Sequence, residues 1–354
     1  MEDNIGFDVE GSVTQLLKKD IARIGKDTIR TWQALLIIGV LAGSVAGISA
    51  VIDWDDIFVG GKAGAVAEAM YDSAKLATTT VTGTYSGFYD FPRRFFRESE
   101  IPRKQIVKTT DAQYTALKEM HSGVSPYAST KIIYDVTAYG HTTADGIALG
   151  DSAFPGLNDR HPRWEVIAHE NGHNFFGGTS AFYGTLAFGH PFLQESLAVM
   201  SAFYTYYAIL ADPSEFGIDA QTVASLTYDF GNGRNYQEAQ YKLYVSRGAS
   251  FDIDDVLTSQ ALDYKMILYG ETYGWNKYIK FSKAFEDGIA PQFTFQDDGV
   301  SATEQSTYVV AALHAAFGKD FRKEFAALNF PVDKALYREI YPKINEYIKS
   351  ASNR

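Results

Sequence analysis

Two histidines and a glutamate stand at a spacing that suits metal chemistry. The segment RHPRWEVIAHENGHNFFGG contains His169, Glu170 and His173 in the pattern H-E-x-x-H. Positions i and i+4 of a helix lie on one face, so both imidazoles can reach one metal ion. Zinc lowers the pKa of a bound water, and Glu170 is placed to accept its proton. The pattern therefore predicts a Zn2+ ion held by His169 and His173, with Glu170 as the catalytic base.

A catalytic zinc needs a third protein ligand, because its fourth position is kept for water. Residues 171–194 contain no Asp and no Glu, so Glu195 is the first acid after Glu170. Pro191 favours a helix that begins shortly before Glu195. Two helices packed antiparallel would bring this acid to the metal. We therefore expect Glu195 to be the third ligand, with His190 as its rival and a favourable helix-dipole contact as its alternative role.

The surrounding segments predict an α+β fold. The segments QIVKTT (105–110), KIIYDVTAYG (131–140) and GIALGDSAF (146–154) are typical of strands, and DAQYTALKEMHSG (111–123) of a helix. The H-E-x-x-H motif lies in a helical pattern that glycines terminate at 177–178. From Pro191 onward the pattern is almost entirely helical. The motif is thus expected where a part with strands meets a helical part.

Composition narrows the class of protein. The chain has 354 residues, of which 46% are hydrophobic and 21% are charged, as in chains that bury a core. Its formal net charge of -11 argues against a nucleic-acid partner, which would require a basic surface. The absence of cysteine excludes disulfides, thiolate metal ligands and thiol nucleophiles. A folded, acidic chain without thiol chemistry remains.

An uncharged run near the start predicts a membrane anchor. Residues 31–52 (TWQALLIIGVLAGSVAGISAVI) carry no charge and would span roughly 33 Å as a helix. That length matches a bilayer core of about 30 Å, so we expect a transmembrane helix. A buried core helix and a cleaved signal peptide are the alternatives. Gly39, Gly43 and Gly47 stand four apart and could pair two such helices. Glycine is also common in membrane helices, so self-association remains an open alternative.

Charges beside this run predict its orientation. Five bases precede it: Lys18, Lys19, Arg23, Lys26 and Arg30. Acids follow it, at Asp53, Asp55 and Asp56. The positive-inside rule then places residues 1–30 in the cytoplasm and the rest of the chain outside. Residues 11–30 are also amphipathic, which suits either an anionic inner leaflet or a solvated helix.

The motif and the acid after it resemble the gluzincin zinc metallopeptidases. The resemblance rests on HENGH and on the L-x-E-S-L-A segment, with 21 residues between His173 and Glu195. It implies that His169, His173 and Glu195 bind zinc, that Glu170 is the general base, and that residues 146–150 form an edge strand for a peptide. The segment from Ser306 is similar to the helical domain of enhancin-like and aminopeptidase-like members.

The chain departs from that family in two ways. Many members carry an acid four residues after the third ligand, where this chain has Val199. The aminopeptidase strand motif is also missing, which favours an endopeptidase. The residue that would stabilise the transition state is left open among Tyr264, Tyr269, Tyr273 and His314.

The expected protein is a membrane-anchored zinc endopeptidase that acts on a peptide or protein substrate. Its predicted parts are a cytoplasmic segment (1–30), a transmembrane helix (31–52), a stalk (53–92), a zincin-like catalytic domain (93–212) and a helical C-terminal subdomain (213–354). The alternative is a structural or receptor-like protein of an envelope, surface layer or virion that retains a metallopeptidase fold. Glu170 favours the enzyme, because a structural zinc site needs no carboxylate beside its ligands.

Overall fold

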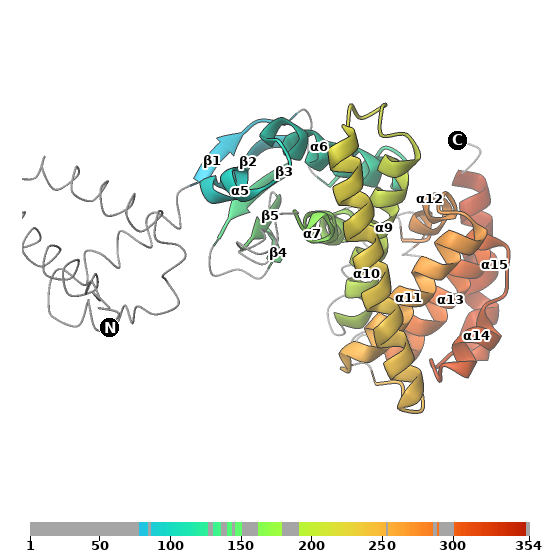
Figure 1. Ribbon diagram of the computed structural model, residues 1–354. Helices are drawn as coiled ribbons and strands as arrows, with labels where there is room; N and C mark the ends of the chain where they lie inside the picture. The colour runs from blue at the N-terminus through green and yellow to red at the C-terminus, as the bar shows by residue number, and fades with distance from the viewer. Residues whose placement is uncertain are drawn as a thin grey trace, which may run out of the picture. The chain divides into compact units, whose positions relative to one another are not determined.

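The computed structural model (Figure 1) describes residues 78–351 with short gaps. The gaps are residues 84–85, 127–129, 136–139, 144–145, 151–161, 179–190, 253, 286–288 and 290–300. The chain divides into two compact units, Met1–Asp72 and Ser73–Arg354, and the described residues all belong to the second. The predicted cytoplasmic segment and transmembrane helix, including Gly39, Gly43 and Gly47, lie outside the described residues. Within the described part, no helix is both long and apolar enough to span a bilayer.

The second unit is a mainly helical α/β structure. Its strands are β1 (Thr78–Val81), β2 (Ser86–Pro92), β3 (Thr130–Tyr134), β4 (Gly140–Thr143) and β5 (Gly146–Leu149). Its helices are α5 (Arg93–Glu98), α6 (Arg103–Met120), α7 (Trp164–Gly178), α9 (Pro191–Ala211), α10 (Ala220–Ser246), α11 (Val256–Tyr273), α12 (Lys277–Lys283), α13 (Ala302–Phe317), α14 (Arg322–Ala327) and α15 (Lys334–Ala351). All described strands precede α7, as the change in sequence pattern predicts.

The strands form one sheet in the order β1-β2-β3-β5-β4. Strands β2, β3 and β5 are parallel, while β1 and β4 pair antiparallel at the two ends. Every residue of β5 is buried, and Ile147 pairs with Ile132 on one side and Thr142 on the other. The expectation of an edge strand at 146–150 is therefore wrong. An apolar GIAL segment suits the interior of a sheet, and the polar GHTT segment of β4 occupies the edge instead.

Two other segments differ from expectation. QIVKTT is the start of α6 rather than a strand, and its buried residues Ile106, Thr110, Gln113 and Leu117 recur at helical spacing. The Thr110 hydroxyl donates to the Ile106 carbonyl oxygen at 3.0 Å, which lets a β-branched residue fit a helix. Residues 78–92, expected within the stalk, form β1 and β2 of the sheet.

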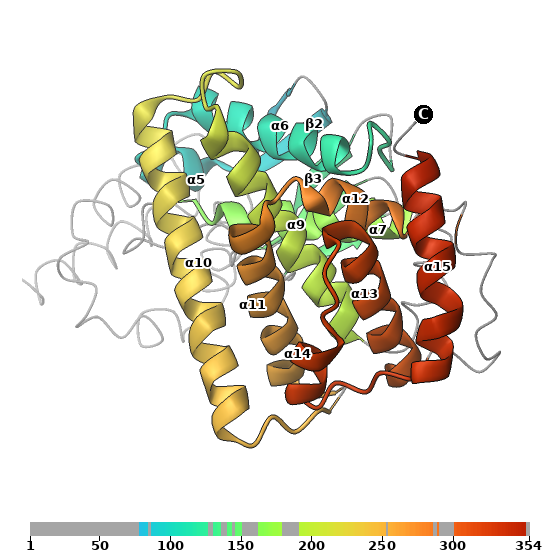
Figure 2. The ribbon, with the colours of Figure 1, turned by 90° about the vertical axis from the view of Figure 1, so that its right-hand side faces the viewer.

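Helix α7 lies between the sheet and the helical part. It packs against β4 and β5 on one side and against α9 and α10 on the other (Figure 1). Figure 2 shows α10, α11, α13 and α15 side by side, with α9 packed behind α11. One continuous apolar core joins the two parts, with Trp164 of α7 and Phe203 of α9 fully buried in it. The helix that carries H-E-x-x-H is thus central to the fold.

Candidate metal centre

The first turn of α7 is held by side chains from other helices. Arg163 precedes this helix and has no oxygen in its side chain to cap it, so a tertiary partner is needed. Asp229 of α10 provides one, because its Oδ2 accepts a hydrogen bond from the Glu165 N–H at 3.2 Å. The Trp164 indole N–H donates to the Ser225 hydroxyl of α10 at 3.1 Å. These contacts fix the direction from which α7 enters the site.

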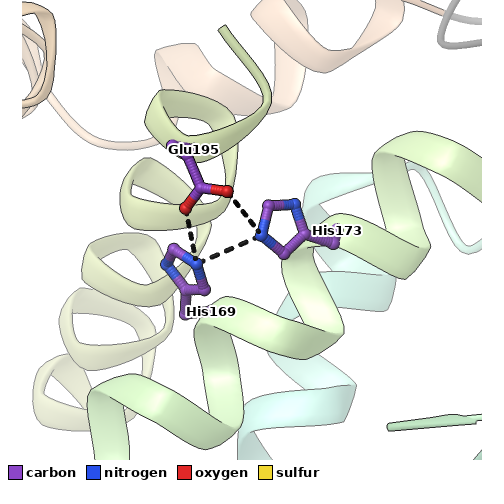
Figure 3. A group of neighbouring side chains, drawn as sticks. All are labelled: His169, His173 and Glu195. Atoms are coloured by element: carbon purple, nitrogen blue, oxygen red, sulfur yellow. Dashed lines mark hydrogen bonds and ion pairs between the residues drawn. The ribbon is translucent and has the colours of Figure 1, made fainter. Parts of the chain in front are cut away.

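A glycine within the motif lets α7 approach α9 closely. A Cβ atom added at Gly172 would lie 2.7 Å from Cβ of Ser201 and 3.2 Å from Cα of Ala198. No side chain other than hydrogen fits there without moving a helix. The close crossing places Glu195, near the start of α9, over the two histidines of α7 (Figure 3).

His169, His173 and Glu195 point toward one another (Figure 3). The Nε2 atoms of the two histidines are 3.1 Å apart. Oε2 of Glu195 lies 3.2 Å from Nε2 of His169, and its Oε1 lies 3.6 Å from Nε2 of His173. Tetrahedral zinc with bonds of about 2.0–2.1 Å requires donor separations of roughly 3.3–3.4 Å. The two imidazole nitrogens are close to this separation, and each lies 3.2–3.6 Å from a different oxygen of Glu195, so the three side chains could bind one ion.

This triad is the group of metal-ligating side chains found among the described residues, with ligand atoms all within 4.8 Å of one another. It resembles the zinc site of an H-E-x-x-H protein with a downstream glutamate. The sequence predicts these same three residues as the metal ligands, and in the structure their ligand atoms lie close enough to bind one ion. The rival ligand, His190, lies outside the described residues.

The charges of the triad support a site for a cation. Burial and the neighbouring His169 together lower the pKa of His173 to about 4 against the opposing effect of Glu195, so this imidazole is neutral and can donate a lone pair. Burial also lowers the pKa of His169, but the hydrogen bond to Glu195 and nearby carboxylates outweigh it and raise the pKa overall. Burial opposes ionisation of Glu195, yet its bond to His169 holds the pKa of Glu195 below the usual value.

Glu170, the residue after His169, lies against the sheet. It is 7% exposed, and a Cβ added at Gly140 of β4 would lie 2.5 Å from its Oε1. Burial raises the pKa of Glu170 to about 7; His169 opposes this shift and Glu195 adds to it. A carboxyl with that pKa can accept and release a proton near neutral pH.

The four candidates for a transition-state donor make contacts elsewhere. The Tyr269 hydroxyl donates to Glu324 at 3.0 Å, and Lys319 donates to the Tyr273 hydroxyl. Nδ1 of His314 lies 2.5 Å from the Tyr337 hydroxyl. The Tyr264 ring packs on Tyr241 with a centroid distance of 5.0 Å. None of these contacts involves the triad, so the structure assigns the role to none of them.

Sequence reasoning missed two acids that contact the helices of the triad, the half-buried Asp229 and the buried Asp263. Asp229 caps α7, and Asp263 of α11 lies next to Ser196, the residue after Glu195. Burial raises the pKa of Asp263 to about 8, while the Ser196 hydroxyl and His169 lower it. Neither acid stands at a recognisable spacing from the motif, because both arrive through the packing of α10 and α11.

Comparison with known proteins names no activity for this chain. No protein-family model matches it, and no curated protein matches it. Among solved structures, it is similar to a functionally unknown conserved protein from Bacillus anthracis str. Ames, with 14% sequence identity and a TM-score of 0.43. The match covers 83% of this chain and 54% of that protein, so the chain spans about half its length.

Proposed function

We propose that this protein is a zinc-dependent endopeptidase. One observation carries the proposal: His169, His173 and Glu195 offer ligand atoms within 4.8 Å of one another, and Glu170 directly follows the first of these residues in α7. A site that only stabilises a fold fills all four positions of zinc with protein ligands. Among the described residues the group has three members, which would leave one position for the water that hydrolysis requires.

The chemistry divides between the metal and Glu170. His169, His173 and Glu195 would hold the zinc ion, which would lower the pKa of a bound water and polarise a peptide carbonyl. Glu170 accepts the proton from the attacking water and then passes it to the leaving amine. The raised pKa of Glu170, about 7, suits both steps. His169 and His173 remain neutral ligands in this cycle.

Strand β4 supports a peptide as the substrate. It ends the sheet order, and no described strand pairs with its outer edge. An extended peptide can add to such an edge through main-chain hydrogen bonds. Gly140 of β4 lies against Glu170, so a peptide on this edge would run next to the catalytic base. This strand takes over the role that the sequence analysis assigned to residues 146–150.

The proposal includes the membrane anchor at residues 31–52 and an extracytoplasmic catalytic part. Support comes from the uncharged run and from the bases that precede it. Membrane fractionation of the full chain tests the anchor. Protease protection of the folded part in intact cells would contradict the orientation.

Metal content and casein hydrolysis together test the function. Wild-type protein should bind one zinc ion per chain and cleave casein. Glu170→Gln should keep the zinc and lose at least about 10²-fold in activity, since only the base is removed. Glu119→Gln, an exposed acid on α6, is the charge-matched control and should retain full activity. Stoichiometric zinc without Glu170-dependent cleavage would favour the structural or receptor-like alternative.

A further inference from the structure

A buried acid on α11 lacks a complete set of partners. Asp263 is 2% exposed, and its Oδ1 has no hydrogen-bond partner among the described residues. Buried carboxyl oxygens are normally paired, because burial without a partner forfeits their hydration. The unpaired oxygen of Asp263 is therefore able to accept a further hydrogen bond.

The contacts of Asp263 lead to the turn that carries Glu195. The Ser196 hydroxyl donates to the Ser259 carbonyl oxygen at 3.3 Å and also lies beside the Asp263 carboxyl, which stands one helical turn further along α11. Ser196 is fully buried and follows Glu195 directly in α9. Helix α11 thus contacts the turn of α9 that carries Glu195 through this hydroxyl.

The charges around Asp263 belong to the same site. The charged groups that act on it are His169 and Glu165 from α7 and Glu195 from α9. Among these three, only His169 can carry a positive charge. A divalent cation at the triad would add the positive charge that a buried carboxylate in this place needs.

The second ring nitrogen of His169, Nδ1, is the atom that an outer carboxylate would bind. Nε2 of His169 faces the other ligands, so its Nδ1 points elsewhere. Histidines that bind metals usually donate this second N–H to a carboxylate or carbonyl, which fixes the ring and strengthens the ligand. Val199, one turn after Glu195 in α9, is apolar and cannot accept it.

We propose that Asp263 is a positioning residue of the metal site, which holds the Glu195 turn through Ser196 and provides the outer negative charge that orients His169. This inference rests on the metal-binding part of the proposed function and not on peptide hydrolysis. The acid comes from a different helix, 68 positions after Glu195 in the chain, so it supports the two zinc helices from the helical part of the fold.

The test is zinc affinity of the full chain, measured by competition with a chelator. Asp263→Asn keeps the shape of the side chain and should weaken zinc binding about 10- to 100-fold. Glu271→Gln, on the same helix but paired with Arg234, is the matched control and should leave zinc affinity unchanged. Ser196→Ala removes one hydroxyl and should weaken zinc binding several-fold.

Unfolding of the zinc-free protein separates positioning from packing. Asp263→Asn should leave its midpoint in urea unchanged, because burial raises the pKa of Asp263 to about 8 in the zinc-free protein and the amide has the shape of the protonated carboxyl. Unchanged zinc affinity in both Asp263→Asn and Ser196→Ala overturns the proposal, and so does a wild-type chain that binds no zinc. Weaker zinc binding in Asp263→Asn, with no casein cleavage by wild-type protein, would uphold the proposal while the peptidase function fails.

Discussion

Helix α7 contacts the helical part of the fold on one side and the sheet on another, and different residues of the candidate site face each part. On the helical side, Gly172 brings Ser201 and its helix close, and Glu195 of that helix completes the metal triad. On the sheet side, Glu170 lies against Gly140 at the sheet edge. The helical side therefore completes the candidate metal site, and the sheet side carries the proposed base and the proposed substrate strand.

Because of this difference, we expect that metal binding and proton transfer can be separated by mutation. Both functions use residues of one helix turn, yet their neighbours come from different parts of the fold. A change on the helical side should reduce zinc affinity first. A change on the sheet side should reduce turnover while zinc remains bound.

The largest expected effect is on the helical side, at a ligand. His173→Ala leaves two protein ligands and should weaken zinc binding by at least about 100-fold, more than the loss of an outer partner costs. His314→Ala is the control, since His314 contacts Tyr337 and Tyr341 and not the triad. Chelator competition measures both. Stoichiometric, tight zinc in His173→Ala would show that the triad is not the site.

The next largest effect is expected at the crossing of α7 and α9. Gly172→Ala puts a methyl group at 2.7 Å from Cβ of Ser201, so α9 must shift, at a cost of about 1–3 kcal/mol in unfolding free energy. Zinc affinity should fall with it, because Glu195 moves away. Ser201→Gly in the same chain should restore both. Gly231→Ala on α10, where nothing lies within 4 Å of the added Cβ, is the control.

A third histidine sharpens the contrast between a metal ligand and a core residue. His121 is 4% exposed and packs on Phe175 and Phe176, and burial lowers its pKa to about 3. Between about pH 3 and pH 6.5, the unfolded chain therefore binds a proton at His121 and the folded chain does not. Its contribution to stability is complete above pH 6.5 and falls as the pH drops from there toward 3.

This linkage predicts that the unfolding free energy depends on pH through His121. When the pH falls from 7.5 to 5, His121 should lower the unfolding free energy of the zinc-free protein by about 2 kcal/mol. His121→Phe keeps an aromatic ring in place and should abolish that part of the pH dependence. Urea unfolding at the two pH values measures it. An unchanged pH dependence in His121→Phe would contradict the buried, neutral state of His121.

The smallest expected effect is on the sheet side. Gly140→Ala places a methyl group at 2.5 Å from Oε1 of Glu170, the mobile end of a flexible side chain. The carboxylate should rotate away, so stability and zinc affinity change little while kcat falls about tenfold, or about 1.4 kcal/mol. Casein hydrolysis and chelator competition on the same sample separate the two. A loss of zinc in Gly140→Ala would mean that the two sides of α7 are not independent.

Distance along the chain explains how much of the candidate site could be predicted from the sequence. His169, Glu170 and His173 lie within one helical turn, so their shared face follows from helix geometry alone. Glu195 was identified as the first acid after the motif, which needs only the expectation that two neighbouring helices pack together. Asp263 could not be found in this way, because nothing in its local segment indicates that α11 packs against α9.

Strand order shows the same limit. The GIAL segment of residues 146–149 was recognised as a strand, because local apolar content is enough for that. Its place between β3 and β4 depends on pairing between segments, and the expected edge position was wrong. QIVKTT was assigned to a strand from its β-branched residues, but burial of one face of α6 outweighed that local preference.

Local sequence patterns identified the groups available for chemistry: two imidazoles and a carboxylate at helical spacing, a nearby acid, no thiols, and an uncharged run that still predicts a membrane anchor. The packing of distant segments decided which strand lies at the sheet edge beside Glu170, and which acids from α10 and α11 contact the two helices of the triad. The physical reason is that backbone periodicity is a local property. Strand pairing and helix crossing depend instead on contacts between segments far apart in the chain, and at Gly172 on the absence of a single methyl group.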